Sequence, residues 1–278
     1  QFATFTENLL IDYRHNQAFS HAWSLCVEEH FYLVLPWLTL VLMQKPAAWK
    51  VYTALAFVFV AGVAVRGFVL VHVLRPLGPA ADHFGTHYIE ALYYPTYVRL
   101  DGLLAGVSCA LVRTFRPGWW AVLRQHGHSS AAGGAAVLAI AGWCSLTRFT
   151  SVTGRAVIAD LFGYPLLGLG FALLTASALS ENGWLARVRV PGARLFATLA
   201  FSLYLTHKAA IHIFLKMFPN APDQTYSMLP VYLAVCLAVA AVLYFGVERP
   251  FLVLRNWQQR DRVAPGSVSS KVRFDPAL

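Results

Sequence analysis

The sequence predicts an all-α protein, a bundle of helices that crosses a membrane several times. Hydrophobic residues make up 58% of the 278-residue chain, and its mean hydropathy is +0.54, which is well above the balance of a soluble globular protein. The apolar residues are gathered in runs of about 20, the helix length that crosses a bilayer. Polar segments rich in Lys and Arg separate these runs, as expected for loops beside a membrane.

Seven apolar runs are predicted to be transmembrane helices. They cover residues 24–43, 51–73, 98–113, 131–147, 157–180, 195–216 and 229–248. The third run is the weakest because it is short and carries Arg99 and Asp101 at its start. We expect one transmembrane domain over residues 1–255. Residues 256–278 are polar and contain Pro, Gly and Ser, so we expect a disordered cytoplasmic tail there.

The loops predict the orientation of the chain, since cytoplasmic loops collect Lys and Arg. One alternate set of loops holds most of the basic residues, namely Lys45, Lys50, Arg113, Arg116, Arg124, Arg187, Arg189, Arg194, Arg249, Arg255, Arg260, Arg262, Lys271 and Arg273. The other set holds Arg14, Arg75, Arg148, Arg155 and Lys216. We therefore expect a cytoplasmic C-terminus and an external segment 1–23. Because that segment is polar and lacks an initiating Met, we expect an odd number of further spans before it.

Charge and cysteine usage argue against two other classes of protein. The net charge is +9, but the basic residues are spread over the loops rather than gathered in one stripe, so we expect no nucleic-acid partner. The four cysteines lie far apart, in or beside apolar runs, which favours neither a disulfide framework nor a zinc site. We expect no metal.

Ionisable residues at membrane depth are candidates for a functional site, because each costs about 2.5–3.5 kcal/mol near a helix centre. Ser24, Glu28 and Tyr32 are spaced by four residues and so share one helix face near the external surface. One turn inside the run, Glu28 needs a cationic or hydroxyl partner. In the alternative, structural interpretation, Ser24 caps the helix and the helix dipole favours Glu28 and Glu29, while Glu29 and His30 face headgroups.

Arg99 and Asp101 are candidate partners for Glu28, since they open their span from the same external side. Opposite charges enter a low-dielectric site together more cheaply than either does alone. Gly102 and Gly106 are four residues apart, a spacing that lets another helix approach closely. In the alternative interpretation, Arg99 only extends to the membrane surface.

A third polar group interrupts the run 195–216 with Ser202, Tyr204, His207 and Lys208. A single His among apolar residues is more often a satisfied core residue than a catalytic one, but a His beside a Lys is unusual for a purely structural membrane helix. At the end of the last span, Glu248 and Arg249 precede Pro250. We interpret them as an interfacial ion pair followed by a helix stop.

Four strings together resemble the acyltransferase 3 family of bacterial integral membrane proteins. They are HAWSLCVEEHFYLVLP, PTYVRLDGLLAG, FSLYLTHK and VERPF; they occur in the family's order and cover residues 19 to 255. The resemblance implies a ten-helix bundle in the bacterial inner membrane. It also implies transfer of an acyl group, commonly acetyl, from a cytoplasmic acyl-CoA such as acetyl-CoA to a hydroxyl of an extracytoplasmic saccharide or glycolipid.

The resemblance also implies roles for particular residues. The family's Ser-x-x-x-Glu pattern falls on Ser24 and Glu28, its arginine motif on Arg99 with Asp101 alongside, and its late histidine on His207. The sequence departs from the family in lacking the first span, which carries the histidine usually assigned as catalytic. We therefore expect three preceding spans, and we expect this stretch of sequence to be inactive alone.

Acyl transfer needs a base for the acceptor hydroxyl and a donor for the charge that develops on the thioester oxygen. We expect Glu28 to orient the base or the acceptor, and Arg99 with Asp101 to organise the polar cavity. The remaining candidates are Ser24, Tyr32 and Tyr204 for substrate, His207 for the donor or the polar network, and Arg113, Arg116 and Arg249 for the CoA phosphates. The cytoplasmic charge bias explains those three arginines equally well.

Two other functions are compatible with the sequence. A polytopic transporter or flippase would use buried Glu, Arg and His to line a substrate path, although the internal symmetry typical of inverted-repeat transporters is not found here. In a purely structural scaffold the deep charges would serve helix packing alone. Such a scaffold would tolerate Glu28→Asp, whereas a site of fixed geometry would not.

Overall fold

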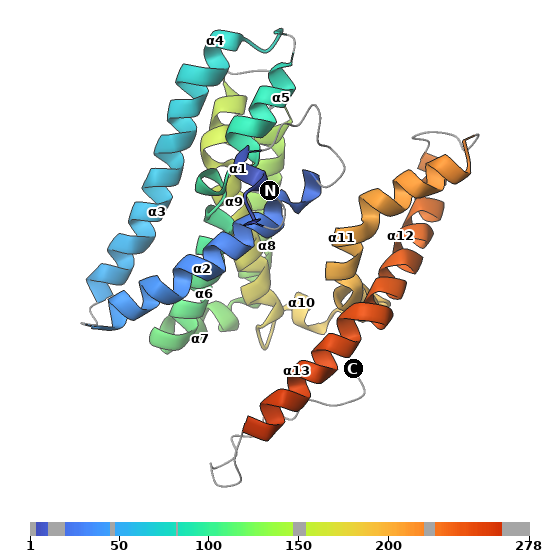
Figure 1. Cartoon of the computed structure of the whole chain (residues 1–278). Helices are drawn as coiled ribbons and strands as arrows, with labels where there is room; N and C mark the ends of the chain where they lie inside the picture. The colour runs from blue at the N-terminus through green and yellow to red at the C-terminus, as the bar shows by residue number, and fades with distance from the viewer. Residues whose placement is uncertain are drawn as a thin grey trace. The chain divides into compact units, whose positions relative to one another are not determined.

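The structure is a computed structural model, and it describes residues 4–10, 20–44, 48–81, 83–146, 154–219 and 226–262. Every regular element in these ranges is helical, and they contain no strand (Figure 1). The chain divides into two compact units, Gln1–Arg189 and Val190–Leu278. Each unit is described by itself.

Three helices are long and apolar enough to cross a membrane: Trp49–Leu77, Ala156–Ala178 and Leu229–Trp257. They coincide with three of the predicted spans, and they indicate a membrane protein. The prediction of an all-helical chain is therefore confirmed for the described residues, while the numbers of seven and ten spans stay predictions.

The other four predicted spans are helical as well, but they are shorter or more polar. They correspond to α2 (Trp23–Gln44), α6 (Asp101–Phe115), α8 (Gly127–Ser145) and α11 (Ala193–Met217). The helix α6 has only 15 residues, fewer than the ~20 that cross a bilayer. The helix α2 carries two glutamates near its start, and α11 carries several basic side chains.

Unit 1 contains short elements around its long helices. They are α1 (Glu7–Leu10), η2 (Ser20–Ala22), η3 (Leu70–Leu74), α4 (Arg75–Leu77), α5 (Phe84–Tyr88), η4 (Ile89–Tyr93), η5 (Thr96–Val98), α7 (Pro117–Gln125) and α10 (Trp184–Arg187). The elements η3 and η4 are π-helical turns. Through η3, α3 (Ala48–Val69) continues directly into α4, so one helix runs from Trp49 to Leu77.

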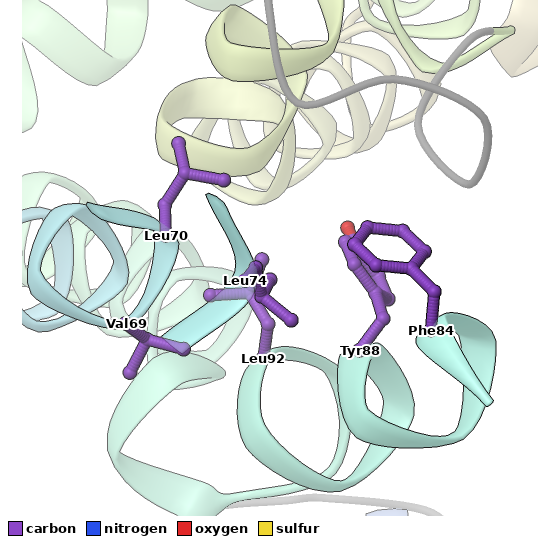
Figure 2. Close-up of a cluster of buried hydrophobic side chains, with 6 residues drawn as sticks. All are labelled: Val69, Leu70, Leu74, Phe84, Tyr88 and Leu92. Atoms are coloured by element: carbon purple, nitrogen blue, oxygen red, sulfur yellow. The ribbon is translucent and has the colours of Figure 1, made fainter. Parts of the chain in front are cut away.

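A cluster of buried apolar side chains packs the end of α3 and η3 against α5 and η4. Val69, Leu70 and Leu74 pack with Phe84, Tyr88 and Leu92 (Figure 2). The Tyr88 hydroxyl donates a hydrogen bond of 2.5 Å to Oδ1 of Asp160, which lies in α9 (Arg155–Ala178) and is fully buried. This cluster fixes α5 and η4 beside α3 and α9.

The closest helix pair in unit 1 is α8 and α9, which lie side by side (Figure 1). Small residues allow this approach, as is common between membrane helices. A Cβ at Gly134 would lie 2.9 Å from the carbonyl oxygen of Gly170, and a Cβ at Gly170 would lie 2.7 Å from the Leu138 side chain. Both glycines are therefore required by the contact.

Unit 2 is a helical hairpin in which α11 packs against α12 (Leu229–Leu243), with the turn η6 (Tyr226–Met228) before α12. A π-helical turn, η7 (Tyr244–Glu248), joins α12 to α13 (Arg249–Arg262) without a break. The predicted helix stop at Pro250 is wrong, because the wider turn directly before Pro250 accommodates the missing N–H donor. The helix extends to Arg262, and residues 263–278 of the predicted tail lie outside the described residues.

Candidate functional site

An open cavity of about 520 Å³ lies among α2, α6 and α9 in unit 1. Its lining includes Ser24 and Glu28 from α2, Arg99 from the segment before α6, and Tyr164 from α9. The structure thus brings together three of the residues predicted to form the site. We call this space the Arg99 cavity.

The spacing of Ser24 and Glu28 explains why both line the Arg99 cavity, since residues four apart lie one above the other on a helix. Ser24 is half-buried, and Glu28 is exposed to the open side. Tyr32 is 58% exposed and does not line the cavity. Its predicted substrate contact has no support in this geometry.

Arg99 is surrounded by aromatic rings. Its guanidinium carbon lies 3.8 Å from the ring centre of Tyr164, 4.7 Å from that of Trp23 and 4.8 Å from that of Tyr93. These three residues form the Arg99 cage. The rings also contact one another, Trp23 and Tyr93 at 5.1 Å and Tyr93 and Tyr164 at 6.3 Å. Cation–π attraction to these three rings therefore stabilises the position of the guanidinium group.

The local backbone explains how the cage forms. The π-helical turn η4 ends at Tyr93, an extended Pro95 follows, and the 3-10 turn η5 leads to Arg99. This change of direction brings Tyr93 and Arg99 together within a few residues, and the neighbouring Tyr94 stacks on Trp23 at 5.3 Å. The sequence analysis did not identify these aromatic residues, although the Tyr-Tyr-Pro string before Arg99 was a usable signal.

The N–H groups of Arg99 have no acceptor within the part of the chain that the structure describes. Its side chain makes neither a hydrogen bond nor an ion pair there. In particular, the expected ion pair between Arg99 and Glu28 is absent from the described residues, although both side chains line one cavity. Three rings thus lie close to the guanidinium group, while no described residue accepts a hydrogen bond from its N–H groups.

Asp101 has a different partner from the one expected. Its Oδ2 accepts a hydrogen bond from Nη1 of Arg66 in a buried ion pair. Arg66 is fully buried and also donates to the carbonyl oxygens of Val98, at 3.0 Å, and Leu161, at 3.1 Å. The prediction that Asp101 would pair with Glu28 or Arg99 as part of the polar cavity is therefore replaced by a pair between α3 and α6.

Arg66 was missed by the sequence analysis. The signal was present, since Arg66 is the one Arg or Lys inside the apolar run 51–73, and such residues usually face a partner. Its role is to fix three elements at once, because its donors reach α6, the end of η5 and α9. It thereby positions the backbone from which Arg99 projects.

The close helix approach expected at Gly102 and Gly106 is found at Gly102, where Gly168 of α9 is the glycine that the contact requires. A Cβ at Gly168 would lie 3.2 Å from the Asp101 carbonyl oxygen and 3.2 Å from Cα of Gly102, whereas a Cβ at Gly102 or Gly106 would meet no atom within 4 Å. Gly102 and Gly106 line the Arg99 cavity, so their missing side chains widen it.

A second cavity of about 480 Å³ lies between α6 and α9, with Phe59 of α3 and Trp120 of α7 contributing to its lining. It is almost wholly apolar, and its one charged lining residue is Asp101. Cys109 and Ala172 line both cavities. The apolar cavity and the Arg99 cavity therefore share a wall.

A small polar network holds Thr96, in the turn η5 that leads to Arg99. The hydroxyl oxygen of Thr96 lies 2.7 Å from Nδ1 of His30 and accepts a hydrogen bond of 2.7 Å from Nδ2 of Asn8. Asn8 also donates to the carbonyl oxygen of Tyr94, at 3.4 Å. His30 therefore contacts Thr96 in the protein, and the alternative in which it faces headgroups is not needed to explain its position.

In unit 2, His207 is half-buried and its Nδ1 lies 2.7 Å from the carbonyl oxygen of Tyr204. A carbonyl only accepts, so Nδ1 carries the proton in this contact. The Sγ of Cys236 donates to the His207 carbonyl oxygen at 3.7 Å. These contacts hold His207 within the α11–α12 hairpin.

The end of the last helix pair differs from the predicted ion pair. The fully buried Ser202 donates a hydrogen bond of 2.7 Å to Oε2 of Glu248, and the guanidinium carbon of Arg249 lies 5.7 Å from the ring centre of Phe245. The π-helical turn η7 brings Glu248 to Ser202. The interpretation of Glu248 and Arg249 as an ion pair is wrong for this structure.

The three arginines predicted for the CoA phosphates, Arg113, Arg116 and Arg249, are all exposed. Arg113 and Arg116 lie at the C-terminal end of α6, where Nη2 of Arg116 donates to the Tyr52 hydroxyl at 3.3 Å. Within the described ranges, no group of three or more His, Cys, Asp or Glu side chains is arranged to hold a metal ion.

Comparison with known proteins finds no matching family model, no similar curated protein and no similar solved structure.

Proposed function

We propose that this protein is a membrane O-acyltransferase of the bacterial inner membrane, which moves an acyl group, acetyl in the simplest case, from cytoplasmic acyl-CoA to a hydroxyl of an extracytoplasmic saccharide or glycolipid. The observation that carries the proposal is the Arg99 cavity, where a carboxylate and a hydroxyl from α2 share one space with a cation whose donors meet no acceptor within the described residues. The resemblance of the four sequence strings to acyltransferase 3 proteins supports the same function.

The proposed chemistry is attack of the acceptor hydroxyl oxygen on the thioester carbonyl carbon. The C–S bond breaks, the acyl group becomes an ester, and the hydroxyl proton passes through a base to the departing CoA sulfur. In this proposal Glu28 and Ser24 orient the acceptor hydroxyl by hydrogen bonds. Arg99 supplies donors to oxygen, and the Arg66–Asp101 pair holds its segment in place.

The apolar cavity beside Asp101 supports a thioester donor. The arm of CoA that carries the thioester, together with the acyl group, has few charges that the lining would need to neutralise. The exposed Arg113 and Arg116 at the cytoplasmic end of α6, and Arg249 in unit 2, are proposed to attract the CoA phosphates. In unit 2, His207 is proposed to help bind the donor and Tyr204 to bind substrate.

The proposal is tested by following radiolabelled acetyl from acetyl-CoA to envelope glycans, in membranes that carry the full-length protein. We expect Glu28→Gln to lower the rate of transfer by about 100-fold or more, because the amide lacks the negative charge with which the carboxylate orients the acceptor hydroxyl.

The matched control is Glu181→Gln. Glu181 is exposed and pairs with Arg124 at 2.5 Å, away from the Arg99 cavity, so this variant should transfer acetyl at the unmutated rate. Equal rates for the Glu28→Gln variant and the control, at equal amounts of inserted protein, would contradict the proposed site. No label with any variant, and no binding of CoA, would favour the transporter.

A further inference from the structure

We infer that the Arg99 cavity binds an anionic group, a carboxylate or a phosphate, on the acceptor, so that the acceptor is an acidic saccharide. The inference rests on the proposed acyltransferase function and names its substrate class. It starts from the contrast between the two deep arginines of unit 1.

Among the described residues, Arg66 forms an ion pair with a carboxylate and Arg99 does not. The guanidinium group of Arg66 forms an ion pair with Asp101, and both side chains are almost completely buried. Arg99 has three rings and no described carboxylate as an ion-pair partner. An arginine keeps its charge in proteins, so Arg99 leaves a positive charge at the wall of the cavity.

The way in which Arg99 is held selects the kind of ligand. Three rings with centres 3.8–4.8 Å from its carbon restrict the rotation of the Arg99 guanidinium group, and the N–H groups along its planar edge donate to no acceptor within the described residues. That edge matches the two oxygens of a carboxylate or a phosphate, which it can bind with two parallel hydrogen bonds. The cage therefore presents Arg99 as a preformed receptor for an anion.

A transition-state charge alone does not account for this arrangement. The negative charge on the thioester oxygen exists only during the reaction, so it cannot compensate Arg99 while the protein is at rest. An acceptor that carries its own negative charge can do so whenever it is bound. This difference favours a ground-state ligand of Arg99.

Glu28 adds a second point of recognition. It lines the same cavity as Arg99 without forming an ion pair with it. When the acidic group of a sugar binds Arg99, one of its hydroxyl groups can donate a hydrogen bond to Glu28, which lines the same cavity. The two side chains would thus select an acidic sugar and orient the hydroxyl that receives the acyl group.

The test measures binding of three probes, glucuronate, glucose 6-phosphate and glucose, to the full-length protein in phosphatidylcholine nanodiscs by calorimetry. We expect at least one of the two anionic probes to bind about 10- to 100-fold more tightly than glucose, as hydrogen bonds to charged groups allow. Arg99→Gln should abolish this preference, and Arg99→Lys should keep only part of it because the planar edge is lost.

The matched control for the substitution is Arg124→Gln, which removes an exposed arginine outside the cavity and should keep the preference. Equal binding of all three probes, or a preference that survives Arg99→Gln, would overturn the inference. Loss of the preference when phosphatidylglycerol replaces phosphatidylcholine would also overturn it, since a lipid headgroup would then be the ligand.

Transfer of acetyl from acetyl-CoA to methyl glucoside and to methyl glucuronide, measured in the same nanodiscs, separates the two proposals. Transfer to both at equal efficiency would contradict the proposal of an acidic acceptor and would agree with the proposed acyltransferase function. Preferential binding of the anionic probes without transfer to either glycoside would contradict the acyltransferase function and would agree with an anion-binding site at Arg99.

Discussion

At the scale of single residues, the pair of Arg66 and Asp101 is the feature with the largest expected effect on stability. Removing one partner of a buried ion pair leaves an uncompensated charge, which typically costs about 3–5 kcal/mol. We predict a loss of this size for Arg66→Met, because the Asp101 carboxylate would remain buried without its cation. Denaturation of the purified protein in bicelles measures the free energy of unfolding.

The double variant Arg66→Met with Asp101→Leu provides the comparison. It removes both charges and keeps apolar volume, so most of the lost stability should return. A double variant no more stable than Arg66→Met alone would show that the hydrogen bonds of Arg66 to Val98 and Leu161, rather than charge pairing, hold this region.

The residue scale also shows what sequence spacing can and cannot predict. Ser24 and Glu28 share the Arg99 cavity because their spacing fixes them to one face of one helix. The pairing of Asp101 with Arg66 was not predictable in this way, because no periodicity relates residues on different helices. The Arg99 cage draws on three separate segments, and its assembly depends on tertiary packing for the same reason.

At the scale of helices, two glycines of α8 allow a matched test of packing. A Cβ at Gly134 would lie 2.9 Å from a backbone oxygen of α9, whereas a Cβ at Gly142 would meet no atom within 4 Å. We predict that Gly134→Ala lowers the free energy of unfolding by about 1–3 kcal/mol through overpacking. Gly142→Ala should raise it by up to about 1 kcal/mol, since alanine is the better helix former.

Both variants make the same chemical change in the same helix, so a difference in unfolding free energy reports the contact with α9. Equal effects of the two substitutions would mean that α8 and α9 do not approach as closely as the structure shows.

The positions of the helices were largely predictable, since apolar runs mark them directly. The π-helical turns at Leu70–Leu74 and Tyr244–Glu248 were not, because one extra residue in a turn leaves no trace in hydropathy. The second of these turns is also the reason why Pro250 does not end its helix. A proline alone is not a reliable stop signal, since Pro36 and Pro165 also lie inside helices, α2 and α9.

At the scale of the whole molecule, the orientation in the membrane is a prediction from the basic loops and is open to a direct test. Arg75 and Arg187 are both exposed and lie in loops predicted on opposite sides. We predict that a membrane-impermeant maleimide labels Arg75→Cys in intact spheroplasts, while Arg187→Cys is labelled only after permeabilisation. A cysteine-free background removes the four native thiols, and the reverse pattern would invert the orientation.

The short helix α1 has a consequence for the motion of the candidate site. Its four residues are too few to be stable alone, and Asn8 ties them to Tyr94 and Thr96. Local opening of α1 therefore requires far less free energy than global unfolding. Each opening removes one partner of Thr96, in the turn that leads to Arg99. Asn8 is thus one of several supports of the segment that carries Arg99, together with His30 and Arg66.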